Sequence, residues 1–217
     1  MINIAIDGPA GAGKSSVAKA AAKQLGYIYV DTGALYRAIG VNALRHGFKT
    51  DDAEKIIPML DNTKVELIYT DGIQRVILNG EDVSEEIRLP EASMAASNVS
   101  AIPEVRAFLL NLQRDIAKKN NVIMDGRDIG TVILPDAQYK FFLTASPEVR
   151  ADRRYKELKE KGSDVDYNAL LEEIIQRDYN DSHRETAPLK QAEDAIFIDT
   201  SNLSFDDSVE AVVSKIR

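Results

Sequence analysis

Short apolar runs alternate with longer segments of helical periodicity along this chain. Runs of four to seven mostly apolar residues predict buried strands, and apolar residues that recur every three or four positions predict amphipathic helices. The predicted strands are 2–6, 27–31, 122–125, 139–145 and 195–199. The predicted helices are 15–25, 33–45, 51–60, 103–119, 147–161, 166–184 and 205–216. Strands separated by helices favour a mainly parallel sheet that is covered on both faces.

An antiparallel segment interrupts this alternation, and residues 62–90 are interpreted as an insertion. The apolar segments 64–70 and 73–79 flank Asp71-Gly72, a dipeptide that strongly indicates a hairpin. Asn79-Gly80 marks a second turn. We therefore expect a small antiparallel piece beside the parallel sheet.

Polar residues predict where three of the helices begin. Ser146, which precedes Pro147, and Asp166 stand where N-caps are expected. Asp51 is expected to cap the helix that follows it, with Glu54 completing a pair that resembles a capping box.

Composition and charge exclude several classes of protein. The 217 residues suffice for one sizeable α/β domain with a full core. There is no cysteine, which fits a cytoplasmic protein, and His46 and His183 are too few for a zinc site built from histidines. The formal net charge of -8 argues against binding to long nucleic acids, although a small anion fits if cations cluster locally. Asp7 interrupts the first apolar run, so we expect neither a signal peptide nor a membrane span there.

The stretch GPAGAGKSS over residues 8–16 matches the pattern G-x-x-x-x-G-K-[ST] between a predicted strand and a predicted helix. Glycines let backbone N–H groups converge on phosphate oxygens, and the helix directs its positive end at them. Lys14 is expected to reach the β and γ phosphates, and the Ser15 hydroxyl to ligate Mg²⁺. The nucleotide-binding residues expected in this phosphate loop are Gly8, Pro9, Ala10, Gly11, Ala12, Gly13, Lys14, Ser15 and Ser16. The alternative is a Gly-rich turn with a surface lysine, and the loop alone indicates only a nucleoside triphosphate.

Polar residues also follow the second predicted strand, in DTGALYR over residues 31–37. Ligands of open α/β sheets bind at the carboxyl ends of strands, so Asp31, Thr32 and Arg37 are expected near the phosphate loop. Asp31 and Thr32 could instead cap the next helix, and Arg37 could lie on the surface. An arginine at this place can, however, bind a phosphate through two N–H groups.

The third predicted strand leads into MDGRDIGT over residues 124–131. Asp125 ends its apolar run, which is the placement expected of a carboxylate near Mg²⁺. Two glycines allow tight turns, and between them Arg127 and Asp128 place a cation and an anion on the loop. The alternative for Arg127 and Asp128 is a purely structural ion pair.

Four further arginines stand on two predicted helices, Arg153 and Arg154 on one and Arg177 and Arg184 on the next. Arg177 and Arg184 are seven residues apart and share a helix face, with Asp181 one turn after Arg177. A solvated charged face is the ordinary explanation. In a chain of net charge -8, several arginines directed at one crevice favour a polyphosphate clamp instead. Neither the N-K-x-D motif of GTPases nor the H-R-D loop of protein kinases occurs.

These motifs together resemble those of bacterial cytidylate kinases. The matching stretches, in order and spacing from Ile2 to about Thr200, are GPAGAGKSS, DTGALYR, SAIPEVR, MDGRDIGTVILPDA, RADRRY, QRDYNDSHRETAPL and DAIFIDTS. The resemblance implies the P-loop nucleoside monophosphate kinase fold, an α/β fold with a five-stranded parallel sheet flanked by helices. It further implies a single P-loop kinase domain over 1–217, with a monophosphate-binding region at 32–100 that includes the insertion and a short helical lid at 150–165.

The implied reaction transfers a phosphoryl group from ATP to CMP or dCMP, with Mg²⁺, and the resemblance assigns roles at matching positions. The implied catalytic residues are Lys14, Arg127, Asp128 and Arg184, of which Arg184 reaches the transferring phosphoryl group. Besides the phosphate loop, ATP is contacted by Arg153 and Arg154 of the lid, and Mg²⁺ by Ser15 and Asp125. The implied substrate-binding residues are Thr32, Arg37, Ser97, Arg106, Arg127, Asp128, Arg177 and Asp181.

Within the substrate site, the resemblance implies that Arg37 and Arg127 grip the CMP phosphate and that Ser97 and Arg106 read the cytosine edge. Arg177 and Asp181 contact the sugar, while Thr32 and Asp128 line the monophosphate site. Position 32 is serine in some members of the family, and threonine keeps the hydroxyl.

Two other functions remain as alternatives. One is a P-loop kinase for UMP, AMP or shikimate, against which the insertion and MDGRDIGT argue. The other is a switch protein that hydrolyses a nucleoside triphosphate slowly, but the arginine-rich C-terminal half favours two nucleotides over one. We expect ATP and CMP or dCMP as partners, no nucleic acid polymer, no membrane, a monomer and a cytoplasmic location.

Overall fold

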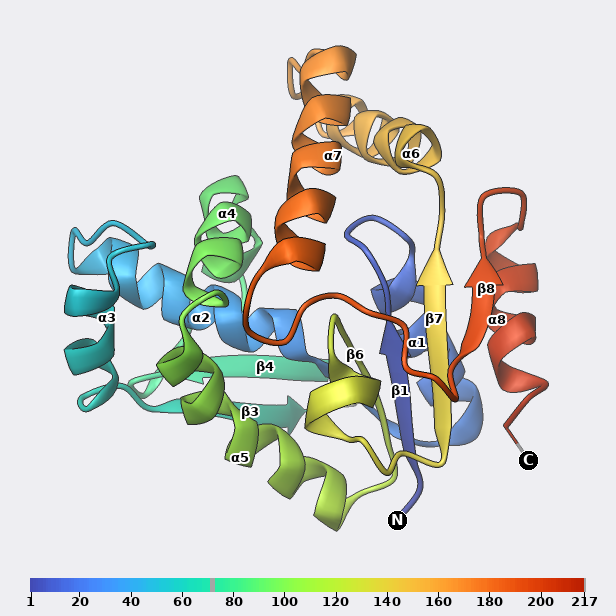
Figure 1. Ribbon diagram of the computed structural model, residues 1–217, viewed down its shortest axis with the longest axis horizontal. Helices are drawn as coiled ribbons and strands as arrows, with labels where there is room; N and C mark the ends of the chain where they lie inside the picture. The colour runs from blue at the N-terminus through green and yellow to red at the C-terminus, as the bar shows by residue number, and fades with distance from the viewer. Residues whose placement is uncertain (71–72, 217) are drawn as a thin grey trace.

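Five parallel strands form the central sheet of the computed structural model, which describes residues 1–70 and 73–216 (Figure 1). The sheet order is β2-β6-β1-β7-β8. The strands are β1 (Asn3–Asp7), β2 (Ile28–Asp31), β6 (Val122–Gly126), β7 (Tyr139–Thr144) and β8 (Ile196–Asp199). Asp125 on β6 stands in register with Ile6 on one side and Asp31 on the other, so three strands end at the same edge. The expected five-stranded parallel sheet is confirmed.

Helices cover both faces of this sheet and extend to one side of it (Figure 1). They are α1 (Lys14–Leu25), α2 (Thr32–Arg45), α3 (Ala53–Leu60), α4 (Pro90–Val99), α5 (Pro103–Lys119), α6 (Pro147–Glu160), α7 (Tyr167–His183) and α8 (Phe205–Val213). Within the described residues, none of these helices has the length and apolar content that a membrane span requires.

Strand β1 shows why both faces of the sheet need a cover. Successive residues of a strand point to opposite faces. Ile4 and Ile6 pack with Val17 of α1 and Val209 of α8, whereas Ala5 packs on the other face, in a cluster with Met124 and Ile129. All of these side chains are buried, which explains the continuous apolar runs in the sequence.

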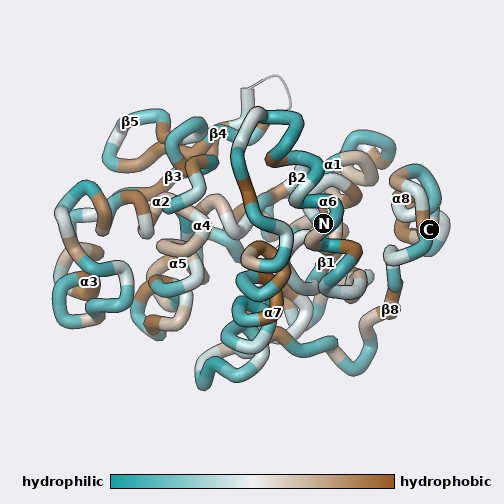
Figure 2. Tube along the Cα trace, turned by 90° about the horizontal axis from the view of Figure 1, so that it is seen from above, coloured by the Kyte–Doolittle hydropathy of each residue, from teal (hydrophilic) through white to brown (hydrophobic). Residues whose placement is uncertain are grey.

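The expected antiparallel insertion is present beside the main sheet. Strands β3 (Val65–Thr70), β4 (Ile73–Leu78) and β5 (Glu81–Asp82) form it in the order β3-β4-β5. The proposed Asp71-Gly72 turn lies outside the described residues. A separate apolar cluster joins β3 and β4 to α2, α3, α4 and α5. Figure 2 shows α3, α5 and β5 at one end of the molecule and β8 and α8 at the other.

Helix α4 was not predicted, because alanine, serine and asparagine give it little apolar periodicity. It forms because it packs closely on α2. A Cβ atom on Gly40 of α2 would lie 2.7 Å from the Cβ of Ala95 on α4, so only glycine allows this approach. The pair α2 and α4 forms one wall of the cleft described below.

Two local expectations were wrong and two were right. Asp52, and not Asp51, is the N-cap of α3, and no side-chain hydrogen bond caps that helix. Residues 129–131, expected in a loop, begin a short π-helical turn, Ile129–Ile133. The Ser146 Oγ and Asp166 Oδ1 atoms do cap α6 and α7, because they accept hydrogen bonds from Val149 N at 3.3 Å and Ala169 N at 2.8 Å.

Candidate active site

A cleft opens where the carboxyl ends of β1, β2 and β6 meet, between the phosphate loop, α2, α4 and α7. The predicted site residues that line it are Ala10, Gly11, Lys14, Ser15, Thr32, Arg37, Ser97, Arg106, Asp125, Arg127, Asp128, Arg177, Asp181 and Arg184. The structure therefore brings together residues that lie up to 174 positions apart, from Ala10 to Arg184. The cleft is also lined by Asp31, Gly33, Tyr36, Ser93, Ala96, Ser100 and Gly126.

The phosphate loop closes tightly over the end of β1. Gly8 has a φ of 147°, and a Cβ atom there would lie 1.8 Å from the carbonyl oxygen of Leu143. Only glycine fits this position. Lys14 is buried at the start of α1, and its Nζ donates a hydrogen bond to the Pro9 carbonyl at 2.7 Å. Burial, reinforced by the charge of Arg127, lowers the pKa of Lys14 to about 7.

Three hydroxyl groups donate hydrogen bonds to Asp125, near the end of β6. The Ser15 hydroxyl donates to one Asp125 carboxylate oxygen at 2.9 Å, and the Tyr29 hydroxyl donates to the other at 2.9 Å. The Thr32 hydroxyl donates to the Asp125 backbone carbonyl at 2.7 Å. Burial, together with the nearby charge of Asp31, raises the pKa of Asp125 to about 6. These contacts join the phosphate loop and β2 to the carboxylate of Asp125, and α2 to its backbone carbonyl.

Asp7, at the end of β1, fixes the segment that follows Arg127 and Asp128. Its two carboxylate oxygens accept hydrogen bonds from the backbone N–H groups of Ile129 and Gly130, both at 2.7 Å. Burial raises the pKa of Asp7 to about 7, despite these two hydrogen bonds. Sequence reasoning did not assign Asp7 to the site, although an acidic residue that ends a buried strand was the signal used for Asp125.

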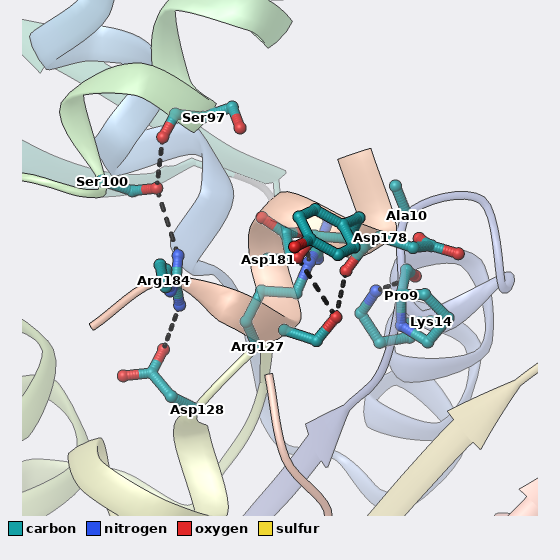
Figure 3. A network of polar contacts seen from close by, with 12 residues as sticks. Pro9, Ala10, Lys14, Ser97, Ser100, Arg127, Asp128, Asp178, Asp181 and Arg184 are labelled. Atoms are coloured by element: carbon teal, nitrogen blue, oxygen red, sulfur yellow. Dashed lines mark hydrogen bonds and ion pairs between the residues drawn. The ribbon is translucent and has the colours of Figure 1, made fainter. Parts of the chain in front are cut away.

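Most of the cleft arginines have an aspartate partner. Arg37 pairs with Asp31 at 2.7 Å, which also caps α2 by accepting from Ala34 N. Arg127 Nε donates to Asp181 at 2.8 Å (Figure 3). Burial, the largest single cause, favours a higher pKa for Asp181, but the charge and hydrogen bond of Arg127, together with the charges of Arg177 and Arg184, lower that pKa overall.

Arg177 differs from these arginines. In the described part of the chain it takes part in no ion pair, and its buried Nε has no hydrogen-bond acceptor. Burial and the neighbouring charge of Arg127 both lower the pKa of Arg177. A half-buried guanidinium whose Nε has no acceptor, next to a second guanidinium, is suited to an anionic ligand.

A second polar network lies toward α4. Arg184 Nη1 donates to the Ser100 hydroxyl at 3.2 Å, and the Ser100 hydroxyl donates to the Ser97 carbonyl at 2.9 Å (Figure 3). Arg184 Nη2 lies 3.9 Å from an oxygen of Asp128. Arg106 donates to the same aspartate and to the Ser100 carbonyl. Arg184, which was assigned to the transferring phosphoryl group, thus donates to Ser100 at the α4 end of the cleft, and its Nε donates to the Ala187 carbonyl at 2.8 Å.

The Arg106 network includes an aromatic ring that sequence reasoning missed. The guanidinium of Arg106 lies 5.4 Å from the ring centre of Tyr36, a cation–π arrangement. Tyr36 stands in DTGALYR, directly before Arg37, and lines the cleft from α2.

Arg153 and Arg154 do not line the cleft. Arg153 donates to the Thr200 carbonyl at 2.7 Å and to its hydroxyl at 3.2 Å. Arg154 forms an exposed ion pair with Glu157 at 2.7 Å. Of the phosphate loop, Gly8, Pro9, Ala12, Gly13 and Ser16 shape the backbone without lining the cleft.

A strand, phosphate loop and helix below a cleft rich in arginine, at the carboxyl edge of a parallel sheet, define a P-loop phosphotransferase. The family model "Cytidylate kinase" matches residues 4–217. This chain therefore belongs to the cytidylate kinase family, which confirms the resemblance and the enzymatic activity expected from the sequence, the phosphorylation of CMP or dCMP with ATP as donor.

Curated cytidylate kinases match this chain in sequence over nearly its whole length. The cytidylate kinase of Caldicellulosiruptor saccharolyticus is 58% identical, and the match covers 98% of this chain and 94% of that protein. The cytidylate kinase of Caldanaerobacter subterraneus subsp. tengcongensis is 57% identical over 100% of this chain and 95% of that protein. Among solved structures, an uncharacterized protein from Eubacterium ventriosum has a TM-score of 0.55 at 16% identity, covering 100% of this chain and 98% of that one. This last likeness concerns the fold alone.

The lowered pKa of Lys14 predicts that nucleotide binding takes up a proton. At pH 8, one unit above a pKa of about 7, about nine-tenths of the Lys14 side chains are neutral in the free protein. Phosphates favour the charged amine and raise its pKa, so ADP binding at pH 8 is expected to take up close to one proton, and at pH 6 almost none. Calorimetry in buffers with different ionisation enthalpies measures this uptake. It should vanish in Lys14→Met, and a binding heat at pH 8 that is independent of the buffer would contradict the prediction.

Proposed function

We propose that this cleft holds ATP on the phosphate loop and CMP or dCMP between α2, α4 and α7, and that the γ-phosphoryl group passes between them. The observation that carries this division is the half-buried guanidinium of Arg177, which lines the cleft, forms no ion pair within the described residues and has a buried Nε without an acceptor. A protein that only hydrolysed a nucleoside triphosphate has no use for a second cationic site of this kind.

The acceptor phosphate lies among Arg37, Arg127 and Arg177 in this proposal. All three line the cleft, and the first two are held by Asp31 and Asp181. A phosphate offers each guanidinium a second acceptor and gives Arg177 its first. The local cations attract a nucleotide even though the whole chain carries a net charge of -8.

The base lies at the α4 end of the cleft. Cytosine presents an amino donor beside an unprotonated ring nitrogen, and a matching site needs both an acceptor and a donor. Asp128 and the Ser97 hydroxyl supply acceptors there, while Arg106 and Arg184 supply donors. We assign Arg184 to this end, because its Nη1 donates to Ser100 and its Nη2 lies 3.9 Å from Asp128, while its Nε is held by the Ala187 carbonyl. A site of this type rejects bases that leave its buried polar groups unpaired.

The sugar lies between the base and the phosphate, beside Asp181 and Arg177 of α7. We propose that Thr32 acts by orienting Asp125, because its hydroxyl is bonded to the carbonyl of that residue. Arg153 and Arg154 keep the assignment to a lid over ATP as a proposal, which requires α6 to release their present contacts. We also propose a monomer as the active form.

Phosphoryl transfer at this site needs positioning and positive charge more than proton transfer. The attacking atom is a phosphate oxygen of CMP that is already ionised, so no strong general base is required. Lys14 and Arg127 both line the cleft, and the charge of Arg127 contributes to the lowered pKa of Lys14, which supports a role for both cations at the transferring group. These cations stabilise the charge that spreads over the phosphoryl oxygens, in a crevice that limits access of water.

Magnesium fits the oxygen ligands beside the phosphate loop. The described residues contain no cluster of three or more histidine, cysteine, aspartate or glutamate side chains that could hold a metal. Mg²⁺ in kinases takes few protein ligands, because phosphates and waters complete its shell. We propose that the Ser15 hydroxyl and the Asp125 carboxylate, 2.9 Å apart, hold it. The ion supplies charge neutralisation at the ATP phosphates when it is bound.

Kinases for UMP, AMP or shikimate and a slow hydrolytic switch are not favoured, because the family match covers residues 4–217. We propose that the α4 end of the cleft, where Arg106 lies, determines which nucleotide is accepted.

Arg177 provides the test of the acceptor site. Arg177→Met keeps the stem of the side chain but removes the guanidinium, so KM for CMP is expected to rise about tenfold or more, as for a lost hydrogen bond to a charged group. KM for ATP should stay within about threefold, because the phosphate loop supplies that site. Arg88→Met is the control, since Arg88 is exposed and pairs only with Glu85. An unchanged KM for CMP in Arg177→Met would remove the acceptor site from this place.

Arg106 provides the test of base selection. In Arg106→Met the cleft loses a donor of the proposed base pocket, and Asp128 loses the closer of its two arginine partners. We expect a higher KM for CMP and a CMP-to-UMP ratio of kcat/KM that narrows by about tenfold or more. Steady-state kinetics with both nucleotides measure the ratio, and the unfolding temperature shows that the variant is folded. If both substrates weaken by the same factor, Arg106 does not read the base.

A further inference from the structure

Arg150, at the first turn of α6, contacts three separate parts of the molecule. Its side chain is 2% exposed, and the sequence analysis did not assign Arg150 to the site. Its Nε donates to the Ala145 carbonyl at 2.9 Å, at the end of β7. Its Nη1 donates to the Ala10 carbonyl at 3.0 Å and to Asp178 of α7 at 3.0 Å, and its Nη2 donates to the second oxygen of Asp178. One buried guanidinium thus joins the phosphate loop to the helix that carries Arg177 and Asp181.

The bond to Ala10 determines how one amide of the phosphate loop is oriented. The described residues contain no cis peptide bond, so the C=O of Ala10 and the N–H of Gly11 point in opposite directions across a planar peptide. Because Arg150 holds that C=O, it turns the Gly11 N–H away from itself. Gly11 lines the cleft and Arg150 does not, so this N–H is directed at the cleft.

Two further observations support a role in positioning. Within the described residues, the N–H of Gly11 has no hydrogen-bond acceptor, which leaves it available to a phosphate oxygen. A Cβ atom at Gly11 would lie 3.3 Å from the Cβ of Arg150, so the arginine stem packs against the loop at this residue. Gly11 has a φ of 74°, a left-handed conformation that the loop must hold before phosphate binds.

Asp178 holds Arg150 in this orientation. It accepts from both terminal nitrogens of the guanidinium, a bidentate arrangement that fixes the plane of the group. Asp178 lies directly after Arg177 in α7, beside the part of the helix that faces the cleft, and Figure 3 shows it close to Ala10. The orientation of the loop amide therefore depends on where α7 lies.

We infer that Arg150 is a positioning residue of the ATP site: it directs the Gly11 N–H at the nucleotide phosphates, and Asp178 fixes it in that position. This inference rests on the proposed binding of ATP phosphates by the loop. This role distinguishes Arg150 from its two neighbours in the sequence. Arg153 bonds to Thr200 and Arg154 pairs with Glu157, so their described partners lie outside the phosphate loop.

The test compares ADP and CMP binding by calorimetry in four variants of the full chain. Arg150→Met keeps the packing of the stem against Gly11 but removes every donor, and it is expected to weaken ADP about tenfold and CMP by less than about threefold. Arg150→Lys, which can donate to the Ala10 carbonyl but lacks the planar fork, should recover part of the ADP affinity. Asp178→Asn should weaken ADP about threefold, because one of the two acceptors is replaced by a donor. The control is Lys161→Met, which breaks an exposed ion pair with Glu157 at the end of α6 and should leave both affinities unchanged.

The outcomes separate this inference from a merely structural role. ADP affinity of Arg150→Met within about twofold of the unmodified protein overturns it, and so does an equal loss for ADP and CMP, which would report general loosening. If Arg150→Met fails to fold, Asp178→Asn decides, because Asp178 is 26% exposed and tolerates the change; unaltered ADP binding then overturns the inference. Absence of CMP binding in the unmodified protein would contradict the proposed function alone, since the ADP comparison depends only on the phosphate loop.

Discussion

A guanidinium that is buried needs acceptors for its charge, and this requirement shapes the whole cleft. An unpaired ion inside a protein costs several kcal/mol, so each buried arginine must be matched by a carboxylate or by a ligand. The matched pairs are Arg37 with Asp31, Arg106 with Asp128, Arg127 with Asp181 and Arg150 with Asp178. Arg184 shares Asp128 with Arg106 at 3.9 Å, and its Nη2 and the Nε of Arg177 are buried without a hydrogen-bond acceptor. Among the cleft arginines that the structure describes, Arg177 is the one that forms no ion pair. In the proposed function, the phosphate of the acceptor nucleotide supplies the partner of Arg177.

The carboxylates also order the backbone around these cations. Asp7 and Asp125 end neighbouring parallel strands, and each ties its strand to a segment from elsewhere in the chain: Asp7 to Gly130 and its neighbour, Asp125 to Ser15. The phosphate loop and the segment after β6 that carries Arg127 are therefore both held by these two strand ends. Phosphoryl transfer depends on how two anions are held relative to one another, and this arrangement sets that relation before either nucleotide binds.

Local signals allowed much of this to be predicted from the sequence, and long-range contacts account for the rest. The phosphate loop, the caps Ser146 and Asp166 and the alternation of strand and helix depend on residues close together in the chain. Asp7 bonds to Ile129, 122 positions away, and Arg150 bonds to Ala10, 140 positions away, and no local pattern reports either contact. Arg150, Arg153 and Arg154 look equivalent in RADRRY, yet they bond to the phosphate loop, to Thr200 and to an exposed glutamate. Helix α4 escaped prediction because its packing on Gly40, and not its own periodicity, stabilises it.

The central claim is that the phosphoryl group leaves ATP for cytidylate, held by the cations of this cleft, and does not pass to water. The most direct measurement follows ADP formation from ATP and Mg²⁺ in parallel reactions with CMP, dCMP, UMP, AMP, shikimate or no acceptor. This account predicts rapid ADP formation with CMP and dCMP, slow formation with UMP and almost none without an acceptor. Equal ADP formation in the presence and absence of CMP would contradict it, because the unmatched Arg177 would then serve some purpose other than binding the acceptor.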